Sequence, residues 1–203
     1  MTVDRANRGA YDVLVELLEL CRAIAAGERA RVERAIAAEP ALARAALKQG
    51  ATRADPHTYR LAPFGHYVYA GDTALHVAAA AYEAAIARLL LKHGADVGAE
   101  NRLGQTPLHY AADGQPGSAH WNPRAQVAVI KVLVGAGAQV DAGPVTPLHR
   151  AVRTRCASAV AALIAAGARV DAKARRLAVT TTGRGGSGSP SALAEQRRIA
   201  RLL

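Results

Sequence analysis

Bulky side chains are scarce in this sequence of 203 residues. Aromatic residues make up 4% of the chain, and phenylalanine and tryptophan occur once each, whereas alanine fills 49 positions. A core with so few large side chains has to come from closely packed elements, and alanine favours helices. The chain is 51% apolar and 21% charged, which excludes a largely disordered protein. We therefore expect helices packed through small side chains.

Cysteine and long apolar runs are scarce as well. Cys21 and Cys156 are the two cysteines, which excludes a disulfide scaffold and favours a reducing compartment. No apolar run approaches the roughly 20 residues that span a membrane. Asp12, Glu16 and Glu19 interrupt the apolar stretch near the N-terminus, which is atypical of a secretory signal. We expect a cytoplasmic protein without a membrane span; the alternative is an effector secreted without a cleavable signal peptide.

Lysine is rare, at 4 positions against 22 arginines, and the net charge of +10 is unevenly distributed. Residues 141–203 contain eleven basic and three acidic residues, so +8 of the charge lies in the last third. Two interpretations stay open. The basic region is either a compositional bias that aids solubility or a surface for an anionic partner.

One short motif occurs three times along the chain. It begins at Thr73, Thr106 and Thr146, and it reads Thr-Ala-Leu-His in the first copy and Thr-Pro-Leu-His in the other two. The copies start 33 and 40 residues apart, and the longer middle unit contains an insertion. Each copy is followed by an apolar stretch and a closing Gly-Ala pair, at residues 94–95, 137–138 and 167–168.

These motifs resemble the ankyrin repeat family, whose unit of about 33 residues carries Thr-Pro-Leu-His and forms two helices and a turn. The first copy departs from the family pattern at Ala74, where proline is usual. The resemblance implies an all-α, ankyrin-type α-solenoid of about five helix-pair units with short β-hairpin fingers. We expect a single domain over residues 1–203 with these parts: a degenerate N-terminal unit (11–46), a long aromatic finger (47–70), a repeat (71–103), a repeat with an interhelical insertion at 113–124 (104–143), a repeat (144–172) and a degenerate capping unit with a Gly/Ser-rich loop at 180–190 (173–203).

The threonine and the histidine of the motif have separate expected roles. The threonine hydroxyl caps the first helix by accepting a free backbone amide. The resemblance implies that the histidine hydrogen-bonds backbone between repeats. A shared metal ion is excluded, because packed helices lie about 8–10 Å apart whereas zinc–nitrogen bonds are about 2 Å long. The structural motif residues are Thr73, His76, Thr106, His109, Thr146 and His149.

Three segments depart from the repeat. Four of the eight aromatic residues lie within residues 57–69, which form either a lid over neighbouring units or a contact patch. The insertion at 113–124 holds the single tryptophan and is either a tolerated bulge or a partner anchor. This insertion and the Gly/Ser-rich loop both fall between the helices of a unit, so the resemblance implies that they emerge on one edge of the stack. The candidate loop anchors are Tyr67, Tyr69, His120 and Trp121.

The resemblance also implies a concave groove, lined by finger tips and by outward positions of the first helices. We expect the groove to change along the stack from small apolar side chains to a basic surface. The expected function is a non-catalytic scaffold that binds a partner protein through this groove and the fingers. The expected contact residues are Val77, Ala80, Glu100, Asn101, Arg102, Leu103, Tyr110, Asp113, Arg150, Arg153 and Thr154.

A second function, from another class, stays open: a basic module that binds an acidic peptide or nucleic acid through the last third. Nucleic acid is the weaker choice, because lysine is scarce and no known reading motif is present. No signature of a hydrolase or a zinc protease appears, and the Gly-rich run lacks the lysine of a phosphate loop. Cys156 begins a helix, where it is either a reactive thiol or a small filler. We therefore predict no enzyme, no cofactor and no metal, and a monomer whose protein partner is of open acidity.

Overall fold

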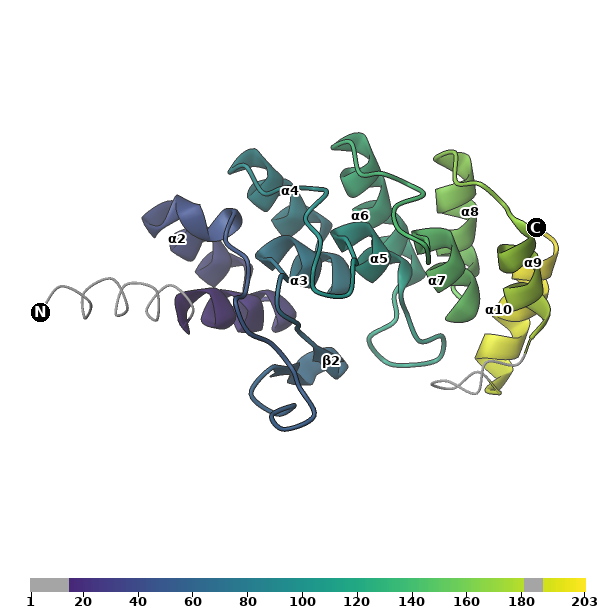
Figure 1. The fold of residues 1–203 in the computed structure, drawn as a ribbon, viewed down its shortest axis with the longest axis horizontal. Coiled ribbons are helices and arrows are strands. Elements are labelled where there is room, and N and C mark those ends of the chain that lie inside the picture. Colours follow the sequence, from purple (N-terminus) through teal and green to yellow (C-terminus); the bar gives the residue numbers. More distant parts are fainter. Residues whose placement is uncertain (1–14, 181–187) are drawn as a thin grey trace, which may run out of the picture.

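The computed structural model describes residues 15–180 and 188–203 and shows a row of helix pairs (Figure 1). The first pair is a helix that includes residues 15–25, followed by α2. The predicted all-α solenoid of five helix-pair units is confirmed. The labelled helices are α2 (Arg29–Ala38), α3 (Ala74–Ala80), α4 (Ala84–Lys92), α5 (Pro107–Ala112), α6 (Pro123–Gly135), α7 (Pro147–Arg153), α8 (Ala157–Ala165), α9 (Ala172–Val179) and α10 (Pro190–Ala200). Short 3₁₀ turns lie at Pro40–Ala43 and Ala62–Phe64.

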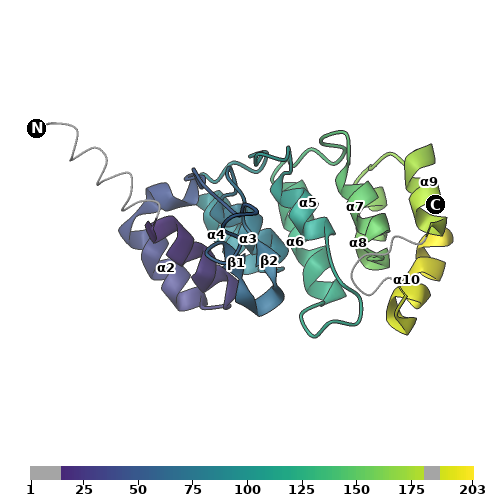
Figure 2. The same ribbon diagram turned by 60° about the horizontal axis from the view of Figure 1, so that its bottom comes forward.

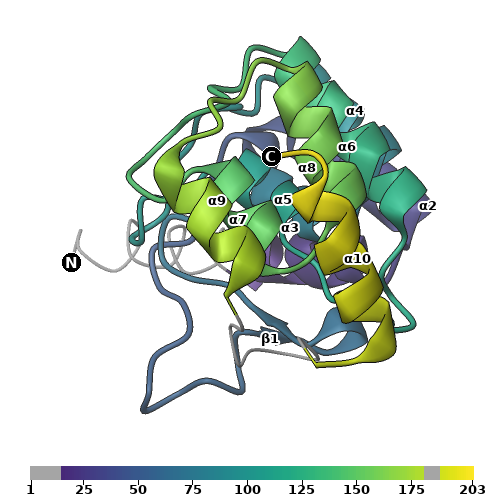
Figure 3. The same ribbon diagram turned by 90° about the vertical axis from the view of Figure 1, so that its right-hand side faces the viewer.

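The first and second helices of the units form two layers. α3, α5, α7 and α9 contact one another in turn, and α4, α6 and α8 form the second layer beside them (Figure 2). Viewed along the stack, the fingers that join one unit to the next lie together on one side (Figure 3). Each unit therefore packs mainly against its neighbours, as repeat proteins do.

Small side chains allow these helices to pack closely. The motif leucines Leu75, Leu108 and Leu148 are fully buried between the layers. Alanines follow each of them on the same helix, and Ala78 and Ala111 are also fully buried. Helices that meet through alanine approach closely, since little side-chain volume separates the two backbones. The alanine-rich composition therefore supplies the contacts between units.

The structure corrects the expectation of β-hairpin fingers. Among the described residues, paired strands occur in the aromatic finger alone, where β1 (Arg60–Leu61) runs antiparallel to β2 (His66–Tyr67). The finger after α4 is instead a turn around Asn101, whose side-chain oxygen accepts the amides of Leu103 and Gln105. The backbone amide of Asn101 also donates to the carbonyl of Gln105 at 3.0 Å, so one backbone bond and the asparagine side chain together close this turn.

Two long insertions lie along the lower edge of the stack in Figure 1. One is the aromatic finger, and the other joins α5 to α6 over residues 113–122 and is called the interhelical loop below. Gly117 of this loop lies against Ser191 at the start of α10, because a Cβ on Gly117 would stand 3.3 Å from the serine Oγ. The end of the Gly/Ser-rich insertion therefore lies near the interhelical loop, whereas its residues 181–187 fall outside the described residues.

Candidate functional site

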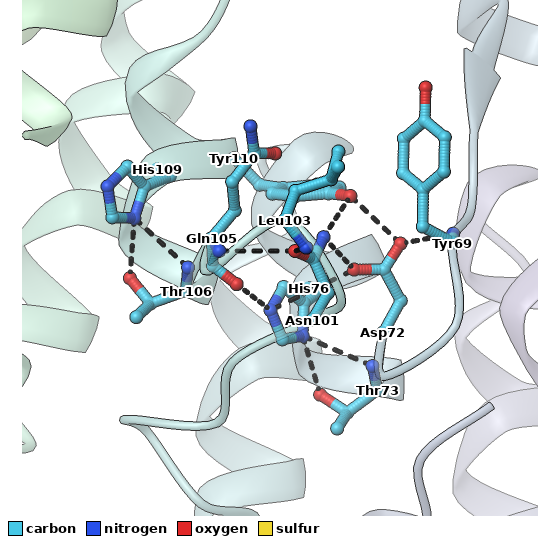
Figure 4. Close-up of polar contacts among 10 residues, drawn as sticks. All are labelled: Tyr69, Asp72, Thr73, His76, Asn101, Leu103, Gln105, Thr106, His109 and Tyr110. Carbon is cyan, nitrogen blue, oxygen red and sulfur yellow. Dashed lines mark hydrogen bonds and ion pairs between the residues drawn. The ribbon is translucent and has the colours of Figure 1, made fainter. Parts of the chain in front are cut away.

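Each motif histidine ties the start of its own helix to the next unit, as Figure 4 shows for His76. The backbone N–H of Thr73 donates to Nδ1 of His76 at 3.1 Å, so Nδ1 is an acceptor and the proton resides on Nε2. His76 Nε2 then donates to the carbonyl of Gln105 in the following finger at 2.9 Å. His109 makes the same bond to the carbonyl of Val145, also at 2.9 Å. The motif therefore forms a backbone tie that is repeated from unit to unit.

These imidazoles are neutral where they are buried. Burial lowers the pKa of His76, and it lowers the pKa of His109 to about 4. His149 differs, because its Nε2 lies 2.9 Å from Oδ1 of Asp171 rather than from a carbonyl. The hydrogen bond from His149 is the main cause that holds the pKa of Asp171 at about 2. The last tie is thus charge-assisted.

A buried polar cluster joins the second and third units (Figure 4). The fully buried carboxylate of Asp72 accepts from Asn101 Nδ2 at 2.8 Å, from the Tyr110 hydroxyl at 2.8 Å and from the Tyr69 amide at 2.7 Å. Burial, followed by the charge of Asp72, raises the pKa of Tyr110. The charge is therefore satisfied by neutral donors, and the cluster fixes the finger at Asn101 against α5.

A pocket of about 710 Å³ opens between the aromatic finger and the interhelical loop. We call it the inter-loop pocket. Phe64 and His66 of the aromatic finger form one wall, and the loop residues His120 and Trp121 form the other. Its floor comes from the ends of the first helices of three successive units, at Ala25–Gly27, at Ala80–Glu83, and at Tyr110, Asp113 and Gly114.

Side-chain hydrogen bonds fix the interhelical loop. The indole N–H of Trp121 donates to Oε1 of Gln126 at 3.2 Å. The fully buried Gln126 in turn donates to the carbonyls of Ala111 and Asp113 at 3.0 and 3.1 Å. Tyr82 donates its hydroxyl to the same Asp113 carbonyl at 2.5 Å. Trp121 is thus held in place at its polar edge while its ring lines the pocket.

The opposite wall is a lid over the third unit. The ring of His66 meets the ring of Tyr110 edge-on, with centroids 4.7 Å apart, and Phe64 lies 6.0 Å from His66. Burial lowers the pKa of His66. Its Nε2 is buried and has no hydrogen-bond partner among the residues that the structure describes. The aromatic finger therefore covers the concave side of α5.

Three of the expected contact residues are not exposed. Val77 and Tyr110 occupy equivalent positions in α3 and α5, where a concave surface was expected, and they are 0% and 1% exposed. The lid formed by the aromatic finger covers Tyr110, and Val77 belongs to the same core. Asn101 is 5% exposed because its side chain belongs to the Asp72 cluster. The expectation that these three side chains form an open contact surface is wrong, and Tyr110 belongs instead to the floor of the inter-loop pocket.

Five of the other expected residues lie on the finger or in the pocket. Glu100, Arg102 and Leu103 are exposed on the finger, and Leu103 is 51% exposed. Ala80 and Asp113 line the inter-loop pocket.

One of the two arginines at the predicted basic end of the groove is paired with a carboxylate. Arg150 forms an ion pair with Asp113, with Nη2 2.8 Å from Oδ2 and Nε 2.9 Å from the same oxygen. Thr154 donates its hydroxyl to the Arg150 carbonyl, and Arg153 is half-buried. The arginines of α7 therefore do not form an open cationic surface.

The four candidate loop anchors also lie in different places. His120 and Trp121 line the inter-loop pocket. Tyr69 lies under Arg102, whose guanidinium carbon is 5.0 Å from the ring centroid and which donates to the carbonyl of Ala51 at 3.0 Å. Tyr67 is half-buried in β2. Tyr69 and Arg102 therefore fasten the aromatic finger to the next finger.

Reactive thiols and metal centres find no support in the described ranges 15–180 and 188–203. Both Cys21 and Cys156 are fully buried, and burial raises the pKa of each thiol to about 12, as fits small core fillers. No group of three or more histidine, cysteine or carboxylate side chains in these ranges is suited to hold a metal ion. No helix in them is long and apolar enough to cross a membrane.

Tyr82 and Arg155 were missed by the sequence reasoning. Both follow a first helix and adopt positive φ, at +58° and +66°, where Gly27 of the first unit has φ +70°. Arg155 is 1% exposed and donates to the carbonyls of Leu177 and Thr180 at the end of α9. Aligning the repeats places Tyr82 and Arg155 at the position of Gly27, and this alignment could have predicted their positive φ.

Comparison with known proteins agrees with the repeats seen in the structure. A model of three ankyrin repeats matches residues 20–142, and a single ankyrin repeat matches residues 145–175. No curated protein matches the chain.

Proposed function

The chain belongs to the ankyrin repeat family, and we propose that it is a non-catalytic scaffold that binds a partner protein at the inter-loop pocket and the finger tips. Ankyrin repeats generally mediate protein–protein interaction. The proposed contact surface comprises Glu100, Arg102 and Leu103 on the finger, and Ala80, His120 and Trp121 in the pocket.

The observation that carries the proposal is the inter-loop pocket between two rigid insertions. A recess of about 710 Å³ is large enough for side chains of a partner segment. The surrounding groups are suited to binding rather than catalysis. Asp113 is held in an ion pair with Arg150, and the ring of His66 packs edge-on against Tyr110. Neither side chain has a hydrogen bond to a serine or cysteine side chain of the described residues, as a general base would. A preformed surface also lowers the entropic cost of binding.

Site-specific photo-cross-linking in extracts of the native source tests this proposal. A photoreactive residue is placed at Leu103 on the finger and, in a second protein, at His120 in the interhelical loop. Matched controls carry it at Lys131 in α6 and Ala161 in α8, which are exposed on the second helices. We expect the same partner to cross-link from both test positions. Equal or stronger cross-linking of that partner from the second helices would refute the proposed surface.

A further inference from the structure

We infer that the inter-loop pocket receives a lysine or arginine side chain of the partner protein. This inference rests on the proposed function and adds the chemistry of the group that is recognised. The net charge of +10 alone would favour an acidic group of the partner, whereas the pocket favours a basic one.

Charge in the pocket is opposite to that of the whole chain. The sequence contains 26 lysines and arginines, yet none of the described residues that line the pocket is one of them. Two carboxylates line it, those of Glu83 and Asp113. Arg150 neutralises Asp113 from outside the lining, whereas the Glu83 side chain makes no ion pair or hydrogen bond with another described residue. The pocket therefore retains one carboxylate without an ion-pair partner among the described residues, and only the N-terminal end of α4, which follows Glu83, offsets part of its charge.

The position of Glu83 strengthens this effect. A Cβ on Gly27 would stand 3.9 Å from Oε1 of Glu83, so the carboxylate lies beside the end of the helix that includes residues 15–25. The last residue of that helix, Ala25, and Ala26 in the turn that follows also line the pocket. The C-terminal end of a helix carries a partial negative charge and favours a cation. The carboxylate and the helix end thus attract the same kind of group.

The remaining walls suit the rest of a basic side chain. Ala80, Phe64 and Trp121 supply apolar and aromatic surface for a methylene stem and for a cation near a ring. The ring of His66 also lines the pocket and presents aromatic surface to the stem of the side chain. An anionic group would instead meet Glu83 with no lysine or arginine in the lining, and an aliphatic group would leave the Glu83 carboxylate without a cation.

Trp121 offers a direct probe, because it is the single tryptophan of the chain and lines the pocket. Its indole N–H resonance is followed by nuclear magnetic resonance during titration with Nα-acetyl-lysine methylamide and Nα-acetyl-arginine methylamide. The norleucine and glutamate analogues serve as uncharged and acidic controls. We expect saturable shifts from at least one basic probe, with a dissociation constant on the order of millimolar for so small a ligand. Shifts of equal strength from norleucine, or none from either basic probe, would overturn the inference.

A matched pair of substitutions tests the role of the charge. Glu83→Gln removes the carboxylate with little change of shape, and Glu100→Gln makes the same change on the exposed finger. We expect about fivefold weaker binding of the basic probe by Glu83→Gln and unchanged binding by Glu100→Gln. Unchanged binding by Glu83→Gln would refute the inference. Titration of the unsubstituted protein at low and high NaCl is a second readout, in which binding unaffected by salt would refute it as well.

The probe titrations and the cross-linking experiment distinguish a failure of this inference from a failure of the proposed function. If the probes fail but Leu103 still cross-links a partner, the scaffold stands and the identity of the recognised group is wrong. If the probes bind but neither Leu103 nor His120 cross-links a partner, the proposed function fails instead.

Discussion

Buried histidines make the stability of the stack depend on pH. The pKa of His109 is lowered to about 4 by burial, whereas a histidine in the unfolded chain titrates near 6.5. Between these values the unfolded chain binds a proton that the folded protein excludes. Stability contributed by the neutral imidazole is therefore complete above about pH 6.5 and is lost as the pH falls towards 4, at up to about 1.4 kcal/mol per pH unit for each such histidine.

Urea denaturation between pH 7 and pH 4.5 measures this dependence. We expect the free energy of unfolding to decrease towards low pH, and His109→Gln to decrease the slope while lowering stability at pH 7. The stabilisation from Asp171, whose pKa is held at about 2, is present throughout this range and is lost only as the pH falls further, towards 2. A free energy of unfolding that stays constant over this range would contradict neutral, buried imidazoles.

Tyr82 adopts a backbone conformation that is costly for a residue other than glycine, and a hydrogen bond compensates. Its hydroxyl donates to the carbonyl of Asp113 at the end of α5 in the next unit. Tyr82→Phe keeps the ring but leaves this carbonyl without the donor, and we expect a loss of about 1 kcal/mol in stability. Tyr67→Phe is the matched control, since no hydrogen bond of the Tyr67 hydroxyl to a described residue is present. Equal thermal denaturation midpoints for the two variants would reject the role of this bond.

The sequence predicted the motif residues better than the cluster around them. Thr73 and His76 recur at fixed positions, so a repeat alignment finds them. Asp72 does not stand out, because its partners Asn101 and Tyr110 come from a later finger and helix. Pairing between distant segments depends on the packed fold rather than on local pattern.

At the level of elements, the sequence predicted where the two insertions lie along the chain, but not that they face each other across a pocket. α5 ends at Ala112 and α6 begins at Pro123, close to the expected insertion at 113–124. The aromatic finger was open to interpretation as a lid or a contact patch, and the structure shows a lid over Tyr110. The inter-loop pocket was not predicted, because its walls come from two insertions that the sequence does not place together.

Two glycines test how closely the interhelical loop is packed. A Cβ on Gly114 would stand 2.7 Å from Sγ of Cys156 and 2.7 Å from the Tyr82 hydroxyl, whereas a Cβ on Gly135 in α6 would meet no atom within 4 Å. We expect Gly114→Ala to lower stability by about 1–3 kcal/mol through steric overlap. Gly135→Ala should raise it by up to about 1 kcal/mol, because alanine favours the helix. Chemical denaturation of both variants provides the comparison, and a neutral Gly114→Ala would contradict the packing described for the loop.

At the scale of the whole molecule, contacts between neighbouring units predict local rather than uniform responses to substitution. Glu195 of α10 accepts the backbone amide of Ala157 at 3.0 Å and so caps the start of α8. Glu195→Ala should therefore lower stability by about 1 kcal/mol and accelerate amide hydrogen exchange in α8. Exchange in α2, at the other end of the stack, should stay unchanged. Equal acceleration in all units would show a single cooperative core instead.

The central claim is that this ankyrin stack recognises a partner with the surface that carries its fingers and insertions. The most direct measurement is amide hydrogen exchange of the protein alone and in complex with the partner found by cross-linking. We predict protection in the finger at residues 97–105 and in the pocket walls at residues 60–67 and 113–122. Protection confined to the second helices α4, α6 and α8 would contradict the account.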